Sequence, residues 1–144
     1  MTTAAASLAT TAWMVMAILI MGPSPTTAEE GQTLTDKTTV QITNGLKVQL
    51  TAHCKSKDDD IGEKSLAFDD SFGWTFYPNY IPNTLFFCSF EWDGSGGKKY
   101  FDIYDAKRDE QRCTDCKWAI FHNGPCFYDE KAKLYDDCYP FNDS

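Results

Sequence analysis

The sequence predicts an all-β fold, an antiparallel β-sandwich of about seven or eight short strands that disulfides staple together. Short segments in which apolar and polar residues alternate recur along the chain, and turn residues separate them at intervals of ~8–12 residues. This spacing is typical of antiparallel sandwiches and differs from the alternating strands and helices of α/β folds. The chain also carries six cysteines, an even number, as expected for a disulfide framework.

The first 28 residues are predicted to be a signal peptide rather than part of the fold. They contain no Asp, Glu, Lys or Arg. The apolar run 12–21 has the length of a signal-peptide core and is too short to cross a bilayer of ~30 Å as a helix. Small residues precede Glu29 and fit a cleavage site. We expect a single secreted domain over residues 29–144 that does not insert into the membrane after cleavage; an uncleaved anchor is the alternative.

The chain has a formal net charge of -8. Nucleic acids and anionic membrane surfaces are bound through clustered Lys and Arg, so this charge argues against both as partners. The charge by itself indicates no function, because acidic surfaces also serve solubility.

Alternation begins at Thr38, and Asn44-Gly45 predicts a hairpin turn into a second strand that ends near Cys54. Asn-Gly is the strongest short-range hairpin signal because both residues tolerate a positive φ. The charged segment 55–64 is predicted to be a loop. Further strands in this half are expected near residues 66–68 and 72–77.

Pro78 and Pro82 bracket a second predicted loop, because proline lacks the amide donor that a strand requires. The segment 84–92 is expected to be the most buried strand, with aromatic residues on both faces. The other predicted elements are a turn at 93–97, strands at 98–104, 117–121 and 126–128, a turn at Gly124-Pro125, and at most a short surface helix within 105–112.

The cysteines are predicted to form disulfides, with the pairing left open. They are Cys54, Cys88, Cys113, Cys116, Cys126 and Cys138. A redox role for the C-x-x-C pair would require a βαβ context and a helix N-terminus that lowers the thiol pKa, and neither is visible. A zinc site would require a second closely spaced pair, and the last two cysteines are twelve residues apart. We expect no metal and no cofactor.

The run Asp58-Asp59-Asp60 could be taken for a calcium site. It does not have the spacing of an EF-hand loop, and three adjacent carboxylates point in different directions, so we expect a solvated turn flanked by lysines. His53 and His122 are the only histidines, and no serine lies in the frame of a nucleophile turn. We therefore expect a protein that is not an enzyme. A hydrolase with paired carboxylates stays open as an alternative.

Most aromatic residues fall at strand spacing and are expected in the core. A secreted wall- or glycan-binding module is the alternative function, and exposed aromatics on one sheet face would identify it. The candidates for such a face are Tyr77 and Tyr80, or Tyr100 and Tyr104. One glycosylation sequon begins at Asn142, and we expect it to be unused because it lies at the terminus.

Several segments together resemble one known family. In order they are V-Q-I-T-N, H-C-K-S-K-D-D-D-I-G, F-G-W-T-F, T-L-F-F-C-S-F-E-W, F-D-I-Y, C-K-W-A-I and G-P-C, and they extend from Val40 to Cys126. Each segment alone is weak, but the ordered set resembles the plant self-incompatibility family of secreted S-protein homologues, of the poppy pistil type.

The resemblance implies a secreted plant protein that acts as an extracellular ligand in cell–cell recognition, with a cell-surface receptor as its partner. It also implies the role of a pistil determinant that a pollen surface receptor recognises. Cys54, Cys88, Cys116 and Cys126 match the cysteines of the family, which leaves Cys113 and Cys138 to pair with each other. The tissue, the receptor and the oligomeric state do not follow from it.

Recognition is expected to fall on loops that a rigid scaffold displays. The segments 55–64 and 78–83 are the first choices, and 105–112 is the third. The candidate binding residues are Lys55, Lys57, Asp58, Asp59 and Asp60 in the first loop, and Asn79 and Tyr80 in the second.

Overall fold

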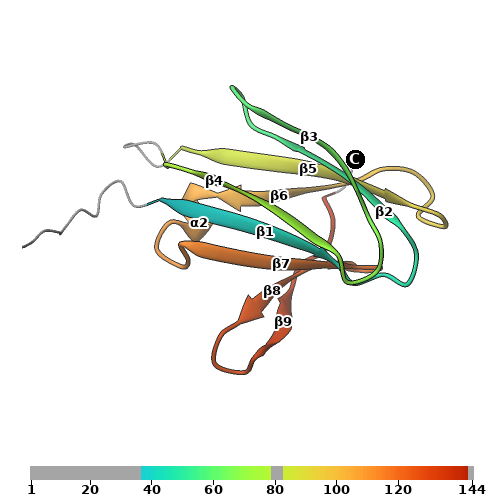
Figure 1. The fold of residues 1–144 in the computed structure, drawn as a ribbon. Helices are drawn as coiled ribbons and strands as arrows, with labels where there is room; N and C mark the ends of the chain where they lie inside the picture. The colour runs from blue at the N-terminus through green and yellow to red at the C-terminus, as the bar shows by residue number, and fades with distance from the viewer. Residues whose placement is uncertain (1–36, 79–82, 143–144) are drawn as a thin grey trace, which may run out of the picture. The chain divides into compact units, whose positions relative to one another are not determined.

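The structure, a computed structural model, describes residues 37–78 and 83–142. Within these ranges the chain forms nine strands and one short helix (Figure 1). The strands are β1 (Thr38–Asn44), β2 (Leu50–Lys55), β3 (Asp60–Leu66), β4 (Ser71–Phe76), β5 (Leu85–Trp92), β6 (Lys99–Asp105), β7 (Asp115–Phe121), β8 (Gly124–Asp129) and β9 (Leu134–Cys138), and the helix is α2 (Ala106–Asp109). The predicted signal peptide lies outside the described residues.

The strands form two sheets, which confirms the all-β prediction. One sheet has five strands in the order β4-β1-β7-β8-β9, and the other has four in the order β3-β2-β5-β6. All the pairs are antiparallel except β1 with β7, which is parallel. Figure 1 shows β1 and β7 side by side in one layer and β2 and β5 in the other.

Residues that alternate along each strand supply the core between the sheets. In β1, Val40 and Ile42 are fully buried while the residues between them are only partly so. Trp118, Phe90 and Ile103 are fully buried from the other strands. Burial of one such side chain contributes about 1.5–3 kcal/mol, so the period-2 pattern fixes which face of each strand turns inward.

The predicted hairpin at Asn44-Gly45 is wrong, because β1 and β2 belong to different sheets. Asn44 is fully buried, and its side-chain amide donates to the carbonyls of Val48 (2.8 Å) and Leu66 (3.0 Å). Its side-chain oxygen accepts from the amide of Leu46 at 2.8 Å. These bonds hold the crossing from one sheet to the other. Gly45 is required there because the Phe121 ring occupies the space that a Cβ would need.

Three further predictions need correction. The segment 55–64 is only partly a loop, because β3 begins at Asp60, and the strand expected near 66–68 is the end of β3. Gly124-Pro125 lies inside β8 instead of forming a turn. β9 was not predicted, because its residues are almost all exposed and do not alternate.

Two of the three disulfides join residues that face each other across neighbouring strands. Cys54 pairs with Cys88 between β2 and β5, and Cys126 pairs with Cys138 between β8 and β9. Cys113 pairs with Cys116. The expected Cys113–Cys138 pair is therefore wrong, because β9 places Cys138 directly opposite Cys126. By restricting the unfolded chain, the Cys54–Cys88 bridge, with a sequence separation of 34, stabilises the fold by about 3.8 kcal/mol. The Cys113–Cys116 bridge, with a separation of 3, stabilises it by about 1.6 kcal/mol.

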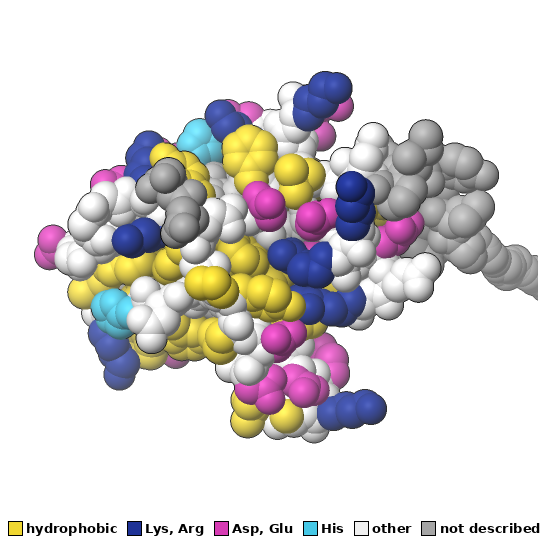
Figure 2. Space-filling view, turned by 180° about the vertical axis from the view of Figure 1, so that it is seen from behind, with side chains coloured by type: hydrophobic (Ala, Val, Ile, Leu, Met, Phe, Trp, Pro, Cys, Tyr) yellow, Lys and Arg dark blue, Asp and Glu magenta, His cyan; other side chains and the backbone are white. Residues whose placement is uncertain are grey.

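The C-terminal segment covers the edge of the four-stranded sheet at β6. The amide of Asn142 donates to the carbonyl of Tyr100 at 2.7 Å. The Phe141 ring lies 6.2 Å from the Phe90 ring and 5.9 Å from the Trp92 ring. Figure 2 shows a band of hydrophobic side chains on the rear of the molecule, with acidic and basic side chains around it.

The short helix α2 links β6 in one sheet to β7 in the other and is more than the surface helix that we predicted. Its last residue, Asp109, is fully buried. The Asp109 carboxylate accepts two bonds from the Arg108 guanidinium, from Nε at 2.7 Å and from Nη2 at 2.6 Å. It also accepts from the amide of Asp105 (3.1 Å) and pairs with Arg112 Nε at 3.6 Å. Buried charges require this degree of pairing.

Both arginines lie on aromatic rings of the core. The Arg108 guanidinium is 5.2 Å from the Trp118 ring, and that of Arg112 is 3.7 Å from the Phe127 ring. Arg108 also donates to the carbonyl of Asp102 in β6 at 2.9 Å. Burial together with the negative charge of Asp109 raises the pKa of Tyr104 to about 12, so this phenol stays neutral in the core.

The substitution Asp109→Ala is expected to lower the free energy of unfolding by about 3 kcal/mol. It removes the carboxylate that both arginines share, which leaves the partly buried Arg108 guanidinium without a counter-charge among the described residues and leaves Arg112 with Asp137 alone, at 3.3 Å. Urea unfolding followed by tryptophan fluorescence measures the change. Glu110→Ala, in the neighbouring exposed acid, is the matched control and should change the free energy by less than about 0.5 kcal/mol. Equal effects of the two substitutions would contradict a structural role for the buried carboxylate.

Candidate functional site

The turn between β2 and β3 and the two chain segments that flank residues 79–82 border one pocket of about 410 Å³. This pocket, which we call the turn pocket, lies at the end of β4 and the start of β5. It is lined by Ser56, Lys57, Asp58, Asp59, Phe76, Tyr77, Asn83, Thr84, Leu85, Phe86 and Phe87. The structure thus brings three of the predicted binding residues, Lys57, Asp58 and Asp59, to one cavity.

The turn at residues 56–59 is held by its own hydrogen bonds. The amide of Ser56 donates to the carbonyl of Asp59 at 2.7 Å, and the Ser56 hydroxyl accepts from the amide of Asp59 at 3.1 Å. A bulge between Cys54 and Lys55 interrupts the ladder just before the turn. Such bulges change the direction of side chains at strand ends.

Asp60 has a different role from its two neighbours. Its Oδ1 atom accepts from His53 Nε2 at 2.7 Å and from the amide of Gly62 at 2.9 Å. The bond from His53 and then that from Gly62 lower the pKa of Asp60 below its usual value of 3.8. Gly62 has a φ of 96°, which favours glycine. Asp60 therefore fastens β2 to β3 and does not line the turn pocket.

Asp58 and Asp59 make no side-chain hydrogen bond or ion pair with any described residue, and Lys57 likewise has no counter-charge there. Lys55 is exposed and lies outside the pocket lining. Asn79 and Tyr80 lie outside the described residues. The first loop therefore presents free charges on the wall of a cavity.

Of the exposed residues in this lining, Leu85 was missed by the sequence analysis, and Tyr77 was named there only as a candidate for stacking on a glycan. Tyr77 is 63% exposed and Leu85 is 39% exposed, although both are large and apolar in part. Each follows or opens a strand at a position where the alternation turns outward. An isolated exposed apolar residue is ordinary, but two beside one cavity are typical of binding surfaces.

The proposed glycan-stacking pair of Tyr100 and Tyr104 does not form, because Tyr104 is fully buried in the core. Tyr100 is 40% exposed on β6 of the four-stranded sheet, whereas Tyr77 follows β4 of the five-stranded sheet. These two rings therefore do not share a sheet face. Tyr80 lies outside the described residues.

The cysteines and histidines considered as metal ligands or catalytic groups make structural contacts with other residues. All the cysteines are paired, and no group of three His, Cys, Asp or Glu side chains within the described residues could hold a metal ion. His53 is bonded to Asp60, and the His122 ring meets the edge of Trp92 at 6.1 Å. In the described part of the chain, no helix has the length and apolar character needed to cross a membrane. The sequon at Asn142 extends beyond the described residues.

Comparison with known proteins matches residues 39–141 to the family described as plant self-incompatibility protein S1. The chain belongs to this family. Among its relatives in Arabidopsis thaliana, S-protein homolog 5 is 49% identical over 92 residues, which cover 64% of this chain and 67% of the relative. S-protein homolog 2 is 43% identical over 117 residues, covering 76% of this chain and 71% of the relative. The resemblance drawn from the sequence segments is thus confirmed.

A solved structure of this self-incompatibility family has the same fold. It is described as a self-incompatibility protein homologue, from a widespread family of small, highly stable, secreted proteins from plants. The TM-score is 0.56 at 16% sequence identity, and the match covers 76% of this chain and 97% of the other.

The substitution Asp60→Asn is expected to reduce the loss of unfolding free energy that the protein undergoes as the pH falls. Because the pKa of Asp60 is lower in the folded state, its contribution to stability is fully present above its ordinary pKa of 3.8 and is lost as the pH falls through the folded-state pKa. The difference in unfolding free energy between the wild type and this variant should be largest at pH values well above 3.8 and should shrink as the pH falls below 3.8.

Urea unfolding at a series of pH values measures this difference. Asp58→Asn is the control, because the Asp58 carboxylate has no hydrogen-bond partner in the described chain. A difference for Asp60→Asn that does not change with pH would show that its bonds to His53 and Gly62 do not form in solution.

Proposed function

We propose that this chain is a small secreted plant protein that acts as an extracellular ligand in cell–cell recognition. It binds a cell-surface receptor protein through the turn pocket. The observation that carries the proposal is the meeting, at one cavity, of free charges on the β2–β3 turn with the exposed side chains of Tyr77 and Leu85.

The scaffold supports a role in binding. One disulfide anchors both strands next to the pocket wall, because it joins Cys54, which precedes the β2–β3 turn, to Cys88 within β5. A turn held in one conformation loses little conformational entropy when a partner binds it. Affinity can then depend on the side chains of the turn, which can vary without disturbing the core.

Secretion is supported by three observations. Residues 1–28 have the pattern of a signal peptide, the described cysteines are all in disulfides, and the matching solved structure is described as belonging to secreted plant proteins. Disulfides of this kind persist in oxidising compartments. The family name supports the pistil determinant of self-incompatibility, recognised at the pollen surface, as the specific role to test first.

The chemistry of the pocket favours binding over catalysis. Among the described residues, its lining contains Lys57, Asp58 and Asp59 as the only ionisable side chains besides Tyr77, and it contains no histidine or free thiol. Two neighbouring carboxylates on an exposed turn are well suited to meet basic groups of a partner. Charges at such a rim mainly set the association rate and the specificity, while buried rings supply affinity.

The experiment is binding of the labelled, oxidised protein, expressed with its leader in a secretory host, to pollen and to other plant cells. Tyr77→Ala is expected to weaken saturable binding by about tenfold or more, because a ring at the centre of an interface is a typical hot spot. Paired Asp58→Asn and Asp59→Asn substitutions should slow association and reduce its salt dependence. Leu134→Ala, at a side chain 49% exposed on β9, is the control and should bind like the wild type.

Excess unlabelled protein should displace the labelled protein from its binding sites on the cells. A rise of cytosolic calcium in pollen alone would point to self-incompatibility. The proposal fails if no cell type binds the protein. It also fails if Tyr77→Ala and Leu134→Ala both bind like the wild type, because recognition would then use another surface.

A further inference from the structure

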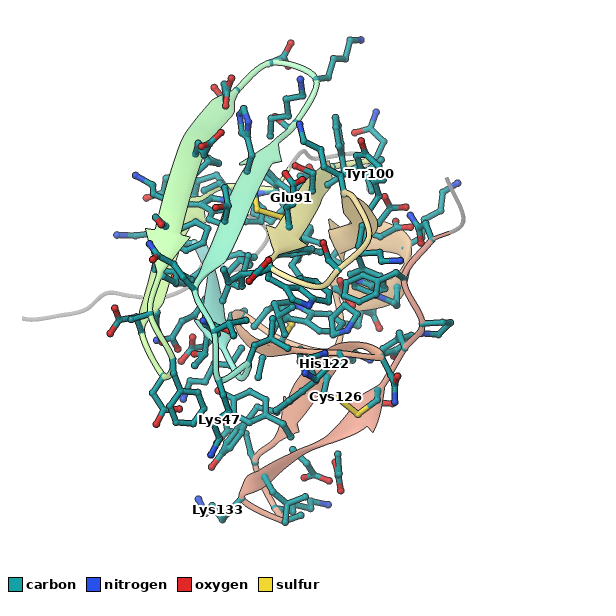
Figure 3. All side chains as sticks on the ribbon, turned by 90° about the vertical axis from the view of Figure 1, so that its right-hand side faces the viewer. Lys47, Glu91, Tyr100, His122, Cys126 and Lys133 are labelled. Carbon is teal, nitrogen blue, oxygen red and sulfur yellow. A yellow bond between two sulfur atoms is a disulfide. The ribbon has the colours of Figure 1, made fainter. Side chains whose placement is uncertain are left out.

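A second groove, of about 620 Å³, lies on the five-stranded sheet at the turn between β7 and β8. Its lining includes Phe121, His122 and Asn123 from that turn, Tyr135 from β9, and the Cys126–Cys138 disulfide. In Figure 3, His122 and Cys126 lie close together at this end of the sheet. We call this cavity the disulfide groove.

The C-terminal segment forms one wall of the groove. Gly124 has a φ of 147°, and the carbonyl oxygen of Tyr139 occupies the place of a Cβ on this glycine. The amide of Tyr139 donates to the carbonyl of Pro125 at 2.9 Å, which fixes the segment against β8. The wall is therefore part of the folded scaffold.

The groove combines apolar rings with polar groups that have no hydrogen-bond partner. The Tyr135 ring is half-buried and packs edge-on against Tyr128 at 4.9 Å, which holds its position. The imidazole of His122 and the side-chain amide of Asn123 are exposed, and neither makes a hydrogen bond with another described residue. Aromatic walls with a few free donors and acceptors are the usual composition of a small-ligand site.

No residue that lines the groove is an Asp, Glu, Lys or Arg, although the chain as a whole has a net charge of -8. The neighbouring cation, Lys117, already lies 3.8 Å from both Asp115 and Glu130. Transfer of an ionic ligand from water into the groove would cost free energy, because no free counter-charge in the described lining would compensate for its lost hydration. A neutral ligand with many hydroxyl groups suffers no such loss and can use the free donors and acceptors.

The register of the sheet places the groove on one cross-strand row with hydroxyl groups near the opposite edge of the sheet. Cys138, Cys126, Ala119, Thr43 and Ser71 are successive cross-strand partners. Ala119 and Cys126 are buried, at 2% and 5% exposure, so the accessible members of the row are Cys138 at one end and Thr43 and Ser71 at the other. At the far end the hydroxyls of Thr43 and Ser71 lie 2.6 Å apart. With neighbouring strands ~4.8 Å apart, the row spans roughly 19 Å, the length of a short oligosaccharide.

We propose that the disulfide groove, together with the hydroxyls of Thr43 and Ser71 beyond it, is a glycan-binding site. The rings of Phe121 and Tyr135 stack on a sugar in the disulfide groove, His122 and Asn123 bond its hydroxyls, and the next sugars of a neutral chain extend toward Thr43 and Ser71. The site is separate from the turn pocket, since the two adjoin opposite ends of β1. The start of β1 pairs with Phe76 and its end pairs with Ile120.

The test uses saturation-transfer NMR and amide chemical-shift mapping on the secreted, oxidised protein. The probes are cellohexaose and xylohexaose as neutral wall fragments, a free high-mannose oligosaccharide as a glycoprotein glycan, and hexagalacturonate as an anionic comparison. A neutral probe should shift the amides at residues 121–126, and hexagalacturonate should bind more weakly. The neutral probe that binds best separates a wall source from a glycoprotein source.

Tyr135→Ala is expected to weaken binding of the best neutral probe by about tenfold, the scale of one stacking contact. Asn123→Ala, at an exposed position of the turn between β7 and β8, should also weaken it. Thr43→Val should weaken binding of a hexasaccharide but not of its disaccharide, because only the longer chain reaches the hydroxyl row. Tyr77→Ala is the control and should bind glycans like the wild type.

The proposal is overturned if none of the neutral probes binds at millimolar concentration. It is also overturned if the shifts map elsewhere, or if Asn123→Ala and folded Tyr135→Ala both bind like the wild type. These results are independent of the receptor assay. A protein that binds cells through Tyr77 but binds no glycan keeps the proposed function and loses only this second site.

Discussion

The arrangement of the two sheets depends on the interactions of the buried Asp109 carboxylate. It lies at the end of α2, within the connection that carries the chain from β6 in one sheet to β7 in the other. Arg108 and Arg112 converge on it, and their guanidinium groups lie against rings of both sheets, among them Phe101 and Trp118. Few alternative arrangements of such a cluster are stable, because buried charges need their counter-charges and hydrogen-bond partners at close range.

This cluster and the disulfides leave the two ends of the sandwich free to carry function. The turn pocket adjoins the start of β1 and displays charges on a bonded turn, while the disulfide groove adjoins its end and displays rings without charges. Their chemistry differs in the way expected for a protein partner and a neutral glycan. Under the two proposals, one end of this rigid scaffold binds a carbohydrate-rich surface while the other end binds a receptor.

The period-2 alternation predicted β4, β5 and β6 well, because each buries one face in the core. It failed where burial is not periodic. β3 is an edge strand with Glu63 and Lys64 in its middle, charges that protect an edge from pairing and that resemble a loop in the sequence. The Asn44-Gly45 signal is local, whereas the bonds from Asn44 reach Leu66, so tertiary contacts decide its conformation.

The candidate sites were accessible to sequence reasoning to different degrees. The charged turn could be found, because three acids between lysines after a strand mark an exposed connection. The disulfide groove could not, since it requires β9, whose residues do not alternate, and the pairing of Cys126 with Cys138. The buried state of Asp109 was hidden for a similar reason: one acid within a charged segment gives no sign of what it packs against.

The central claim is that a partner meets the protein at the turn pocket. Photocrosslinking on living plant cells tests it most directly, with p-benzoylphenylalanine placed at Tyr77 in one sample and at Leu134 of β9 in another. The account predicts a covalent adduct with a membrane protein from position 77, competed away by unlabelled protein, and none from position 134. An adduct from position 134 with none from position 77 would contradict it.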